Sequence, residues 1–288
     1  MTAGLLIITV LNALSSASIL VLAALGLAVI FGMMGVINVA HGEFIMLGAY
    51  GTFVFTHLLG LNIWLSMALG TLVVGVIGLL IERAVIARLY GRPLDTLLAT
   101  WGLSLALVQV IRLSFGPQAQ FLALPLVGNV TLAGVNFPVY RLLLVGLAVA
   151  ALFLLVWLFQ RTDFGVDARA VIQNPSTAAA MGIDTSRMYM LTFGIGTAFA
   201  GLAGAVLSPL LNVEPAMGQK LIVKAFLVVV VGGAEIVGGT ALSSGLLGAI
   251  DSYVSYLTTP YFGSVALLAA AILLIRFRVH GLLVRSES

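Results

Sequence analysis

The residues between Gly35 and Tyr50, GVINVAHGEFIMLGAY, hold the side chains best suited to chemistry in this chain. Asn38, His41 and Glu43 come within six positions, after about thirty apolar and small residues, and the apolar pattern then resumes. Polar groups at membrane depth are tolerated only where they line a cavity or pack against protein. The pattern therefore predicts a broken membrane segment, and broken segments in transporters lie beside the transport path.

Each of these three side chains has a structural interpretation beside the functional one. Asn38 both donates and accepts hydrogen bonds, which suits a passing amide or zwitterion, but a cap on the broken helix explains it equally well. For His41, a ring bonded to a backbone carbonyl is favoured over a group that titrates. Glu43 stands where the resumed helix begins and its dipole stabilises a carboxylate, so stabilisation is favoured over path lining.

Two further acidic residues complete the candidate substrate path. Glu235 lies at a turn between the glycine pairs at 232–233 and 238–239, where solvation and a role in gating explain a carboxylate equally well. Asp251 lies within the apolar stretch Ile236–Leu257, so it should face the bundle interior or a cavity. We expect Asp251 to contribute to bundle structure more than to cargo contact.

The rest of the composition is that of a membrane protein. Hydrophobic residues make up 61% of the 288 and charged residues only 8%, with a mean hydropathy of +1.20, whereas about a quarter of a soluble domain is charged. The chain has no cysteine, which excludes disulfides and thiolate chemistry. P-loop, zinc-binding and serine-nucleophile motifs are absent, and no basic run is interleaved with aromatics. We therefore expect no catalytic residue, metal, cofactor or nucleic-acid partner for this chain.

Nine apolar stretches predict an all-α, polytopic integral membrane bundle with eight or nine membrane segments, at least one of them discontinuous. They are Gly4–Gly35, Phe44–His57, Ile63–Ile81, Leu94–Phe115, Val139–Phe159, Met188–Leu211, Leu221–Gly232, Ile236–Leu257 and Phe262–Ile275. A membrane span takes about twenty residues, so Phe44–His57 and Leu221–Gly232 are short. Both adjoin Gly-rich, polar interruptions, which favour a substrate path over a simple kink.

The basic residues predict the orientation. They gather in three regions, with Arg83, Arg88 and Arg92 in one loop, Arg161, Arg169 and Arg187 in a second, and Arg276, Arg278 and Arg285 in the tail. By the positive-inside rule all three are cytoplasmic, so we expect a cytoplasmic C-terminus, while the side of the N-terminus stays open. Lys220 and Lys224 are left for the other side or its interface, and 116–138 is the longest extracytoplasmic connection.

The loop at about 160–187, QRTDFGVDARAVIQNPSTAAAMGIDTSR, is longer than an ordinary helix connection. It predicts a short helix that begins at Asn174 and Pro175 and stops at Gly182, with Asp184 capping the next helix. A short helix lying flat under a membrane bundle is a natural docking surface for a soluble motor. The alternative is a helix that only closes the floor of the bundle.

Two of these motifs resemble a known family. INVAHGEFIMLGAY at 37–50 is similar to the signature of LivH-type permeases, and AAAMGI at 178–183 resembles the ATPase-coupling loop of ABC importer permeases. The resemblance covers essentially the whole chain. Three runs look most similar to the urea permease branch, namely 19–38 (ILVLAALGLAVIFGMMGVIN), 88–105 (RLYGRPLDTLLATWGLSL) and 217–233 (MGQKLIVKAFLVVVVGG). Lys224 and the run Ala234-Glu235-Ile236 depart from the pattern of that branch.

The resemblance implies a single transmembrane permease domain over 1–288, forming half of the translocation path of an ABC importer for urea or a short-chain amide. It implies a multi-pass protein of the bacterial cytoplasmic (inner) membrane that is not itself an enzyme, since partner subunits use the ATP. The partners would be a second homologous permease, two cytoplasmic ATPases, an extracytoplasmic solute-binding protein and the lipid bilayer. The residues implied in ATPase coupling are Asn174, Ala179, Ala180, Met181, Gly182 and Ile183.

Two alternatives remain beside this interpretation. The first is an ABC importer permease for a branched-chain amino acid. Urea is favoured over it because the inferred path offers few charges, and desolvating a zwitterion without partners is costly. The second is a self-sufficient channel or ion-coupled carrier. A carrier would show charged pairs at the midplane, where only Asp251 qualifies, and the loop at 160–187 would then have no role.

Overall fold

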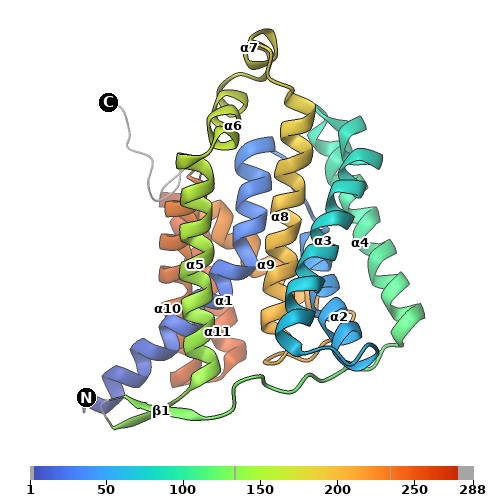
Figure 1. The fold of residues 1–288 in the computed structure, drawn as a ribbon. Coiled ribbons are helices and arrows are strands. Elements are labelled where there is room, and N and C mark those ends of the chain that lie inside the picture. Colours follow the sequence, from blue (N-terminus) through green and yellow to red (C-terminus); the bar gives the residue numbers. More distant parts are fainter. Residues whose placement is uncertain (1–2, 133, 234, 278–288) are drawn as a thin grey trace.

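The computed structural model describes residues 3–132, 134–233 and 235–277, which form a helical bundle with a small β-hairpin at one end (Figure 1). Its elements are α1 (Ala3–Met34), α2 (His41–His57), α3 (Ile63–Ala84), the 3₁₀ helix η1 (Ile86–Leu89), α4 (Pro93–Phe115), β1 (Asn129–Leu132), β2 (Val135–Pro138), α5 (Val139–Arg161), α6 (Asp163–Gln173), α7 (Pro175–Ala180), α8 (Thr185–Leu207), α9 (Met217–Gly232), α10 (Ile236–Leu257) and α11 (Pro260–Phe277). The predicted all-α class is confirmed apart from this hairpin.

Each of the nine predicted apolar stretches corresponds to a helix, but the expected eight or nine membrane segments are not confirmed. Among the described residues, five helices, α1, α3, α4, α5 and α8, are each long and apolar enough to cross a membrane, and counting α9 and α10 together gives up to six. Two of the predicted segments are short. At 1.5 Å per residue, the 17 residues of α2 and the 16 of α9 reach about 25 Å, less than the hydrocarbon core of about 30 Å.

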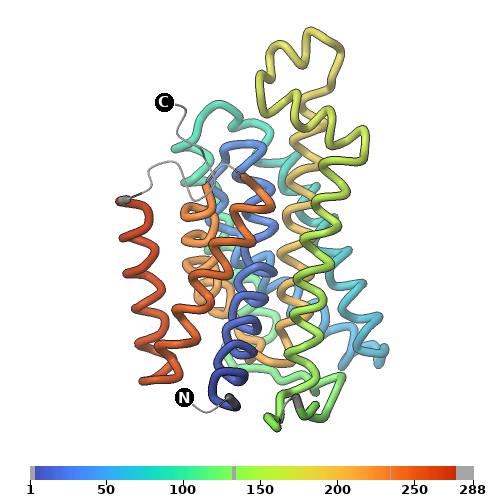
Figure 2. Tube along the Cα trace, turned by 90° about the vertical axis from the view of Figure 1, so that its left-hand side faces the viewer, coloured from blue at the N-terminus to red at the C-terminus, as the bar shows by residue number. Residues whose placement is uncertain are grey.

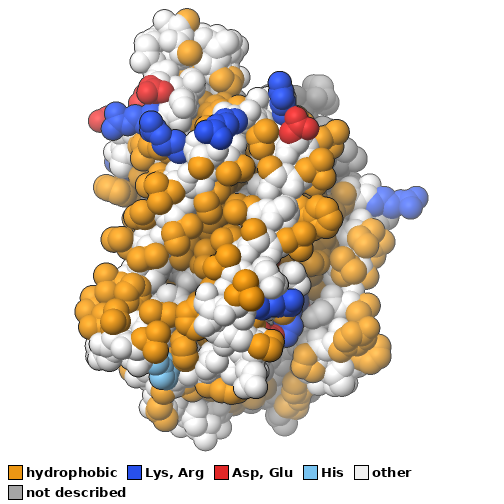
Figure 3. All heavy atoms as spheres, turned by 90° about the vertical axis from the view of Figure 1, so that its right-hand side faces the viewer, with side chains coloured by type: hydrophobic (Ala, Val, Ile, Leu, Met, Phe, Trp, Pro, Cys, Tyr) orange, Lys and Arg blue, Asp and Glu red, His pale blue; other side chains and the backbone are white. Residues whose placement is uncertain are grey.

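α1 and α8 form the centre of the bundle and are mostly buried, whereas α3, α4 and α5 are mostly exposed. Figure 2 shows α11 at the outer edge of the bundle, on the side away from α5 and α6. The exposed faces carry large aliphatic and aromatic side chains, such as Leu80, Leu113 and Phe153. Figure 3 shows hydrophobic side chains over much of the face that α3 and α4 cover, below the charged end of the molecule, as expected of a surface that faces lipid.

Small residues let α2 lie between α8 and α9. A Cβ added to Gly204 of α8 would lie 1.8 Å from the carbonyl oxygen of Ile45 in α2. Gly42 of α2 and Gly218 of α9 face each other, and a Cβ on either would lie 2.4 Å from the other's carbonyl oxygen. Glycine at these positions is therefore required by backbone-to-backbone contact of the kind that membrane helices use.

The two ends of the bundle differ in charge and in structure. The described arginines of the two basic loops, with Arg276 at the end of α11, lie at the end that carries α6 and α7 (Figure 1). Arg278 and Arg285 lie outside the described residues. α1 begins at the opposite end, beside the hairpin, where Gly4 is next to Val135. The structure thereby places the start of α1 at the end opposite α7, whereas the sequence did not determine on which side the N-terminus lies.

The connection at 116–138 contains the β-hairpin. β1 and β2 pair in antiparallel register, with Val130 opposite Phe137. Gln120 and Val213 exchange backbone hydrogen bonds of 2.8 and 3.0 Å. The second contact ties the α4–α5 connection to the α8–α9 connection at the hairpin end of the molecule.

Candidate functional site

The broken segment predicted around Asn38 is present. α1 ends at Met34, Gly35 turns the chain at φ +62°, and α2 begins at His41. The His41 Nε2 atom lies 3.0 Å from the carbonyl oxygen of Ala23. Ala23 precedes Met34 by 11 residues, or about 16 Å along the axis of α1. The chain therefore folds back along α1 and starts α2 inside the bundle, beside the middle of α1.

The polar side chains of this segment are buried and only partly satisfied. Asn38 and Glu43 are 1% exposed and His41 is fully buried. Within the part of the chain that the structure describes, both polar atoms of the Asn38 amide, His41 Nδ1 and Glu43 Oε2 have no hydrogen-bond partner. Buried polar atoms are normally paired with protein or water, so these four atoms have free capacity to bind water or a polar solute.

These contacts decide between some of the interpretations of the three residues. The expected bond from the His41 ring to a backbone carbonyl is present. Glu43 lies in the first turn of α2, as expected for stabilisation by the helix dipole. The N-cap of α2 is Ala40, without a side-chain cap bond, so Asn38 does not cap this helix. A role for the three in the substrate path stays a prediction.

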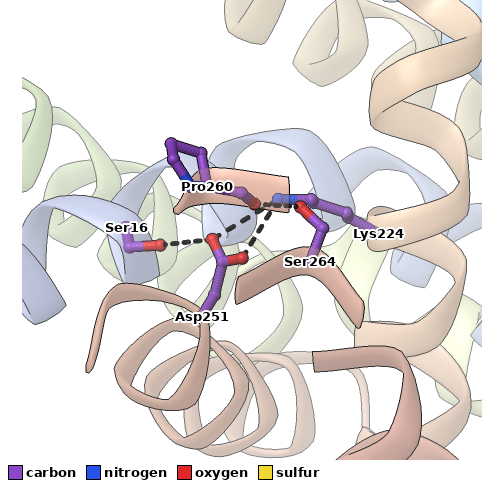
Figure 4. A network of polar contacts seen from close by, with 5 residues as sticks. All are labelled: Ser16, Lys224, Asp251, Pro260 and Ser264. Carbon is purple, nitrogen blue, oxygen red and sulfur yellow. Dashed lines mark hydrogen bonds and ion pairs between the residues drawn. The ribbon is translucent and has the colours of Figure 1, made fainter. Parts of the chain in front are cut away.

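A second polar site lines an open cavity of about 780 Å³ between α1, α9, α10 and α11. The Lys224 ammonium lies 3.3 and 3.4 Å from the two carboxylate oxygens of Asp251. Ser16 of α1 donates a hydrogen bond of 3.2 Å to Asp251 Oδ2 (Figure 4). Ser264 of α11 lies close by and donates to the Pro260 carbonyl oxygen at 3.2 Å. The expectation that Asp251 faces a cavity is confirmed.

The mouth of this cavity carries a second ion pair. Lys220, one helical turn before Lys224, bonds Glu214 in the α8–α9 connection, and 70% of the Lys220 side chain is exposed. The same connection pairs with Gln120 at the hairpin end. The cavity therefore opens toward the end of the molecule opposite α7.

Glu235 lies in neither site. It is exposed at the N-cap position of α10 and makes no side-chain cap bond. The neighbouring Ile236 lies against Gly32, near the end of α1. The five residues predicted for the substrate path thus lie in three places: Asn38, His41 and Glu43 together, Asp251 in the cavity, and Glu235 at the surface.

Comparison with known proteins identifies the family to which the chain belongs. Residues 9–277 match the profile of the family described as "Branched-chain amino acid transport system / permease component". The chain belongs to this family. It is 28% identical over 291 residues to the high-affinity branched-chain amino acid transport system permease protein BraD of Pseudomonas aeruginosa, covering 96% of this chain and 95% of that protein.

Other relatives match over most of their length. The LivH permease of Escherichia coli K12 is 28% identical, with 96% of this chain and 94% of LivH covered. The probable LivH permease of Methanocaldococcus jannaschii is 29% identical, with 88% and 82% covered. No solved structure matches the chain. The LivH-type resemblance is confirmed, whereas nothing in these matches supports the urea permease branch.

In this member of the permease family, the helix predicted in the loop at 160–187 is present as α7. The Asn174 side chain accepts a hydrogen bond of 3.0 Å from the Thr177 amide, and Gly182 ends the turn at φ +91°. Asp184 caps α8 by accepting from the Arg187 amide at 3.0 Å. α6 fills the first part of the loop, and α7 projects beyond the rest of the bundle (Figure 1).

The residues predicted for ATPase coupling lie mainly on the projecting surface of this permease. Asn174, Ala179, Ala180 and Gly182 are exposed, Ile183 is half-buried, and Met181 is 78% exposed. An exposed large apolar side chain at the tip of a helix suits contact with another protein. Their coupling role stays a prediction.

Lys224 is the residue that the sequence reasoning missed. From the sequence, Lys224 is left for the outer side or its interface and no charged partner is named for Asp251, whereas the two residues form an ion pair across 27 positions of sequence. The available signal was a lysine one turn after Lys220 in the otherwise apolar α9, a position where a charge needs a partner.

Proposed function

We propose that this permease forms one half of the translocation path of an ABC importer for a branched-chain amino acid. The observation that carries the proposal is the full-length match to permeases described as branched-chain amino acid transporters. The cavity supports it, because its wall is largely aliphatic, with leucines from α1, α9 and α11, and it also holds two opposite charges. A hydrophobic amino acid has these same two features, an aliphatic side chain and a zwitterionic head.

The charges in the cavity also favour a branched-chain amino acid over urea as the cargo. Urea was favoured because the inferred path offered dipoles and few charges. The Lys224–Asp251 pair, with a second pair at the mouth, changes that inventory. A zwitterion entering this cavity meets partners for both of its charges, so its desolvation is offset.

The arginine-rich end with α6 and α7 is proposed to be cytoplasmic, which also places the C-terminus there. There the loop at 160–187 would dock one of two ATPase subunits, which hydrolyse the ATP. A second homologous permease would complete the path in the bacterial inner membrane. An extracytoplasmic solute-binding protein would deliver cargo at the hairpin end, where the cavity opens.

The packing offers a route from the docking loop to the broken segment. α8 begins at the Asp184 cap, directly after α7. Further along α8, Gly201 and Gly204 contact α2 at Gly48 and Ile45. A displacement of α7 would therefore move α8 and, through backbone contact, the short helix that carries His41 and Glu43.

The test is uptake into proteoliposomes that contain the full complex with its own binding protein. Labelled leucine, urea and acetamide are supplied in turn, with ATP or a non-hydrolysable analogue inside. We expect saturable, ATP-dependent leucine uptake and no transport of urea or acetamide. ATP-dependent urea uptake without leucine uptake would refute the cargo, and uptake driven by an ion gradient without ATP would favour a carrier.

A further inference from the structure

The Lys224–Asp251 pair occupies an unusual place for two charges. Lys224 lies in α9 and Asp251 in α10, and their side chains are only 29% and 15% exposed. Charged residues inside a membrane bundle are rare, and they usually mark a substrate or ion pathway. As a purely structural contact the pair is poorly explained, because a buried ion pair adds little stability over apolar residues of similar size.

We propose that this pair is a charge-exchange station for the zwitterionic head of the cargo. The Asp251 carboxylate would receive the α-ammonium group, and the Lys224 ammonium would receive the α-carboxylate. The inference rests on the proposed function, since it presupposes that an amino acid passes this cavity. It adds the two residues that recognise the head group, which the family match does not identify.

The geometry of the pair suits such an exchange. Ser16 donates to Asp251 Oδ2 from α1, on the side away from Lys224, so the carboxylate keeps a partner when the pair opens (Figure 4). Lys224 carries its charge on a flexible four-carbon stem, and its Nζ is bonded to no residue other than Asp251 among those described. Asp251 is thus the held partner and Lys224 the mobile one.

The cavity around the pair has room for the aliphatic part of the cargo. Its volume of about 780 Å³ lies within the range of about 300–1,000 Å³ typical of small-molecule sites. Leu20, Leu221, Leu227 and Leu267 are among the residues that line it. These apolar walls would hold a branched side chain while the head group faces the two charges.

Energetics explain why the two charges belong together. Removing a charge from water costs several kcal/mol unless a partner replaces the water. When a zwitterion inserts between Lys224 and Asp251, one ion pair becomes two, and no charge is left unpaired at any stage. The station would therefore lower the barrier to entry without trapping the cargo, since the original pair re-forms when the cargo leaves.

The experiment uses five variants of the full complex in proteoliposomes, with labelled L-leucine as the probe. The variants are Lys224→Gln, Asp251→Asn, the double neutral Lys224→Gln/Asp251→Asn, the charge swap Lys224→Asp/Asp251→Lys, and the control Arg112→Gln, which removes an exposed charge of α4 outside the cavity. Three quantities are measured for each: leucine uptake rate, ATP hydrolysis stimulated by the binding protein, and the melting temperature of the complex. Hydrolysis and melting report on assembly, so a variant that fails to fold is recognised as such.

We expect each single neutral variant to lower leucine uptake about tenfold or more, with the control lowered less than twofold. The double neutral variant should stay as low as the singles although its melting temperature recovers, because no unpaired charge remains. The swap should recover part of the uptake, since it retains both charges for the zwitterion. Stimulated hydrolysis should stay within twofold of wild type for the double neutral and the swap.

Two results would overturn the proposal that the Lys224–Asp251 pair binds the head group of the cargo. Wild-type uptake by the double neutral variant would show that the pair is structural, because a structural contact needs only the absence of an unpaired charge. Single variants that transport like wild type would show that cargo does not contact the pair. A wild-type complex that takes up no leucine, isoleucine or valine would instead refute the proposed function, so the two failures are distinguishable.

Discussion

The broken segment and the Lys224–Asp251 cavity are both polar sites inside an apolar bundle, but they satisfy their polar groups differently. At the broken segment, the atoms of Asn38, His41 and Glu43 that lack partners are fully buried. In the cavity, the charges are paired with each other and remain partly accessible. The cavity is therefore ready to meet a solute from outside, whereas the broken segment becomes accessible only if the helices around it move.

The difference indicates two stages of transport. Cargo delivered at the hairpin end would first reach the cavity, where its charges exchange partners. Passage beyond the cavity would need a movement of α2, which starts inside the bundle beside Ala23 and contacts α8 through glycines. The following substitutions test the packing of α2, the coupling loop, the accessibility of the two sites and the end of the path.

The largest effect is expected where α2 meets α8. Gly204→Ala would place a Cβ 1.8 Å from the Ile45 carbonyl oxygen, and overpacking costs about 1–3 kcal/mol even where side chains can adjust. Because the obstacle here is backbone, we expect loss of assembled complex. Gly146→Ala in α5 is the matched control, since a Cβ there meets nothing within 4 Å. The measurement is the yield and melting temperature of the purified complex, and equal values for the two variants would contradict this account of α2.

The next substitution, at Gly182, tests whether the coupling of ATP hydrolysis to uptake can be lost while the complex still assembles. Gly182 has φ +91° after α7, a conformation that glycine and asparagine adopt and that β-branched residues do not. Gly182→Val should leave the membrane bundle assembled but lower leucine uptake about tenfold and uncouple it from hydrolysis, whereas Gly182→Asn should retain most of both. Uptake and binding-protein-stimulated hydrolysis are compared in the same vesicles. Wild-type values for Gly182→Val would remove this position from the coupling surface.

Local features of this molecule could be predicted from the sequence, because adjacent residues determine them. Breaks at Gly35 and Gly182, the cap at Asp184 and the helix at Asn174 follow from backbone preferences and capping. The bond from His41 to a carbonyl was also predicted, but not that its partner would be Ala23 in the middle of α1. That partner depends on how far the chain folds back after Gly35, which no local pattern encodes.

Features that depend on helix packing could not be predicted. The Lys224–Asp251 pair joins helices whose relative rotation is set by contacts along their whole length. The sequence distinguished Glu235 at a turn from Asp251 facing the interior or a cavity, but it did not show which helices would surround Asp251. The expected eight or nine spans are not confirmed, because an apolar run such as that of α2 or α9 reveals composition, whereas crossing a membrane also requires length.

A moderate effect is expected when one thiol reagent is used to probe both the broken segment and the Lys224–Asp251 cavity. The chain has no cysteine, so Asn38→Cys and Ser264→Cys each introduce a single thiol. Ser264 lines the open cavity, and we expect its cysteine variant to react with a small charged thiol reagent in the resting complex. The buried Asn38→Cys variant should react at least fivefold faster during ATP turnover than at rest. Equal reactivity of Asn38→Cys in both states would show that the broken segment does not open with the transport cycle.

The smallest effect is expected at Glu235, which helps to define where the path ends. Its side chain is exposed and makes no hydrogen bond or ion pair within the described residues, and substitutions at such sites usually change stability by less than about 0.5 kcal/mol. If Glu235 is only solvated, Glu235→Gln should leave leucine uptake and melting temperature within experimental error of wild type. A role in gating would instead require the charge, so uptake would fall while melting stayed constant. The comparison with Asp251→Asn in the same assay is decisive, because both variants remove one negative charge from α10 or its N-cap and only Asp251 lies in the cavity.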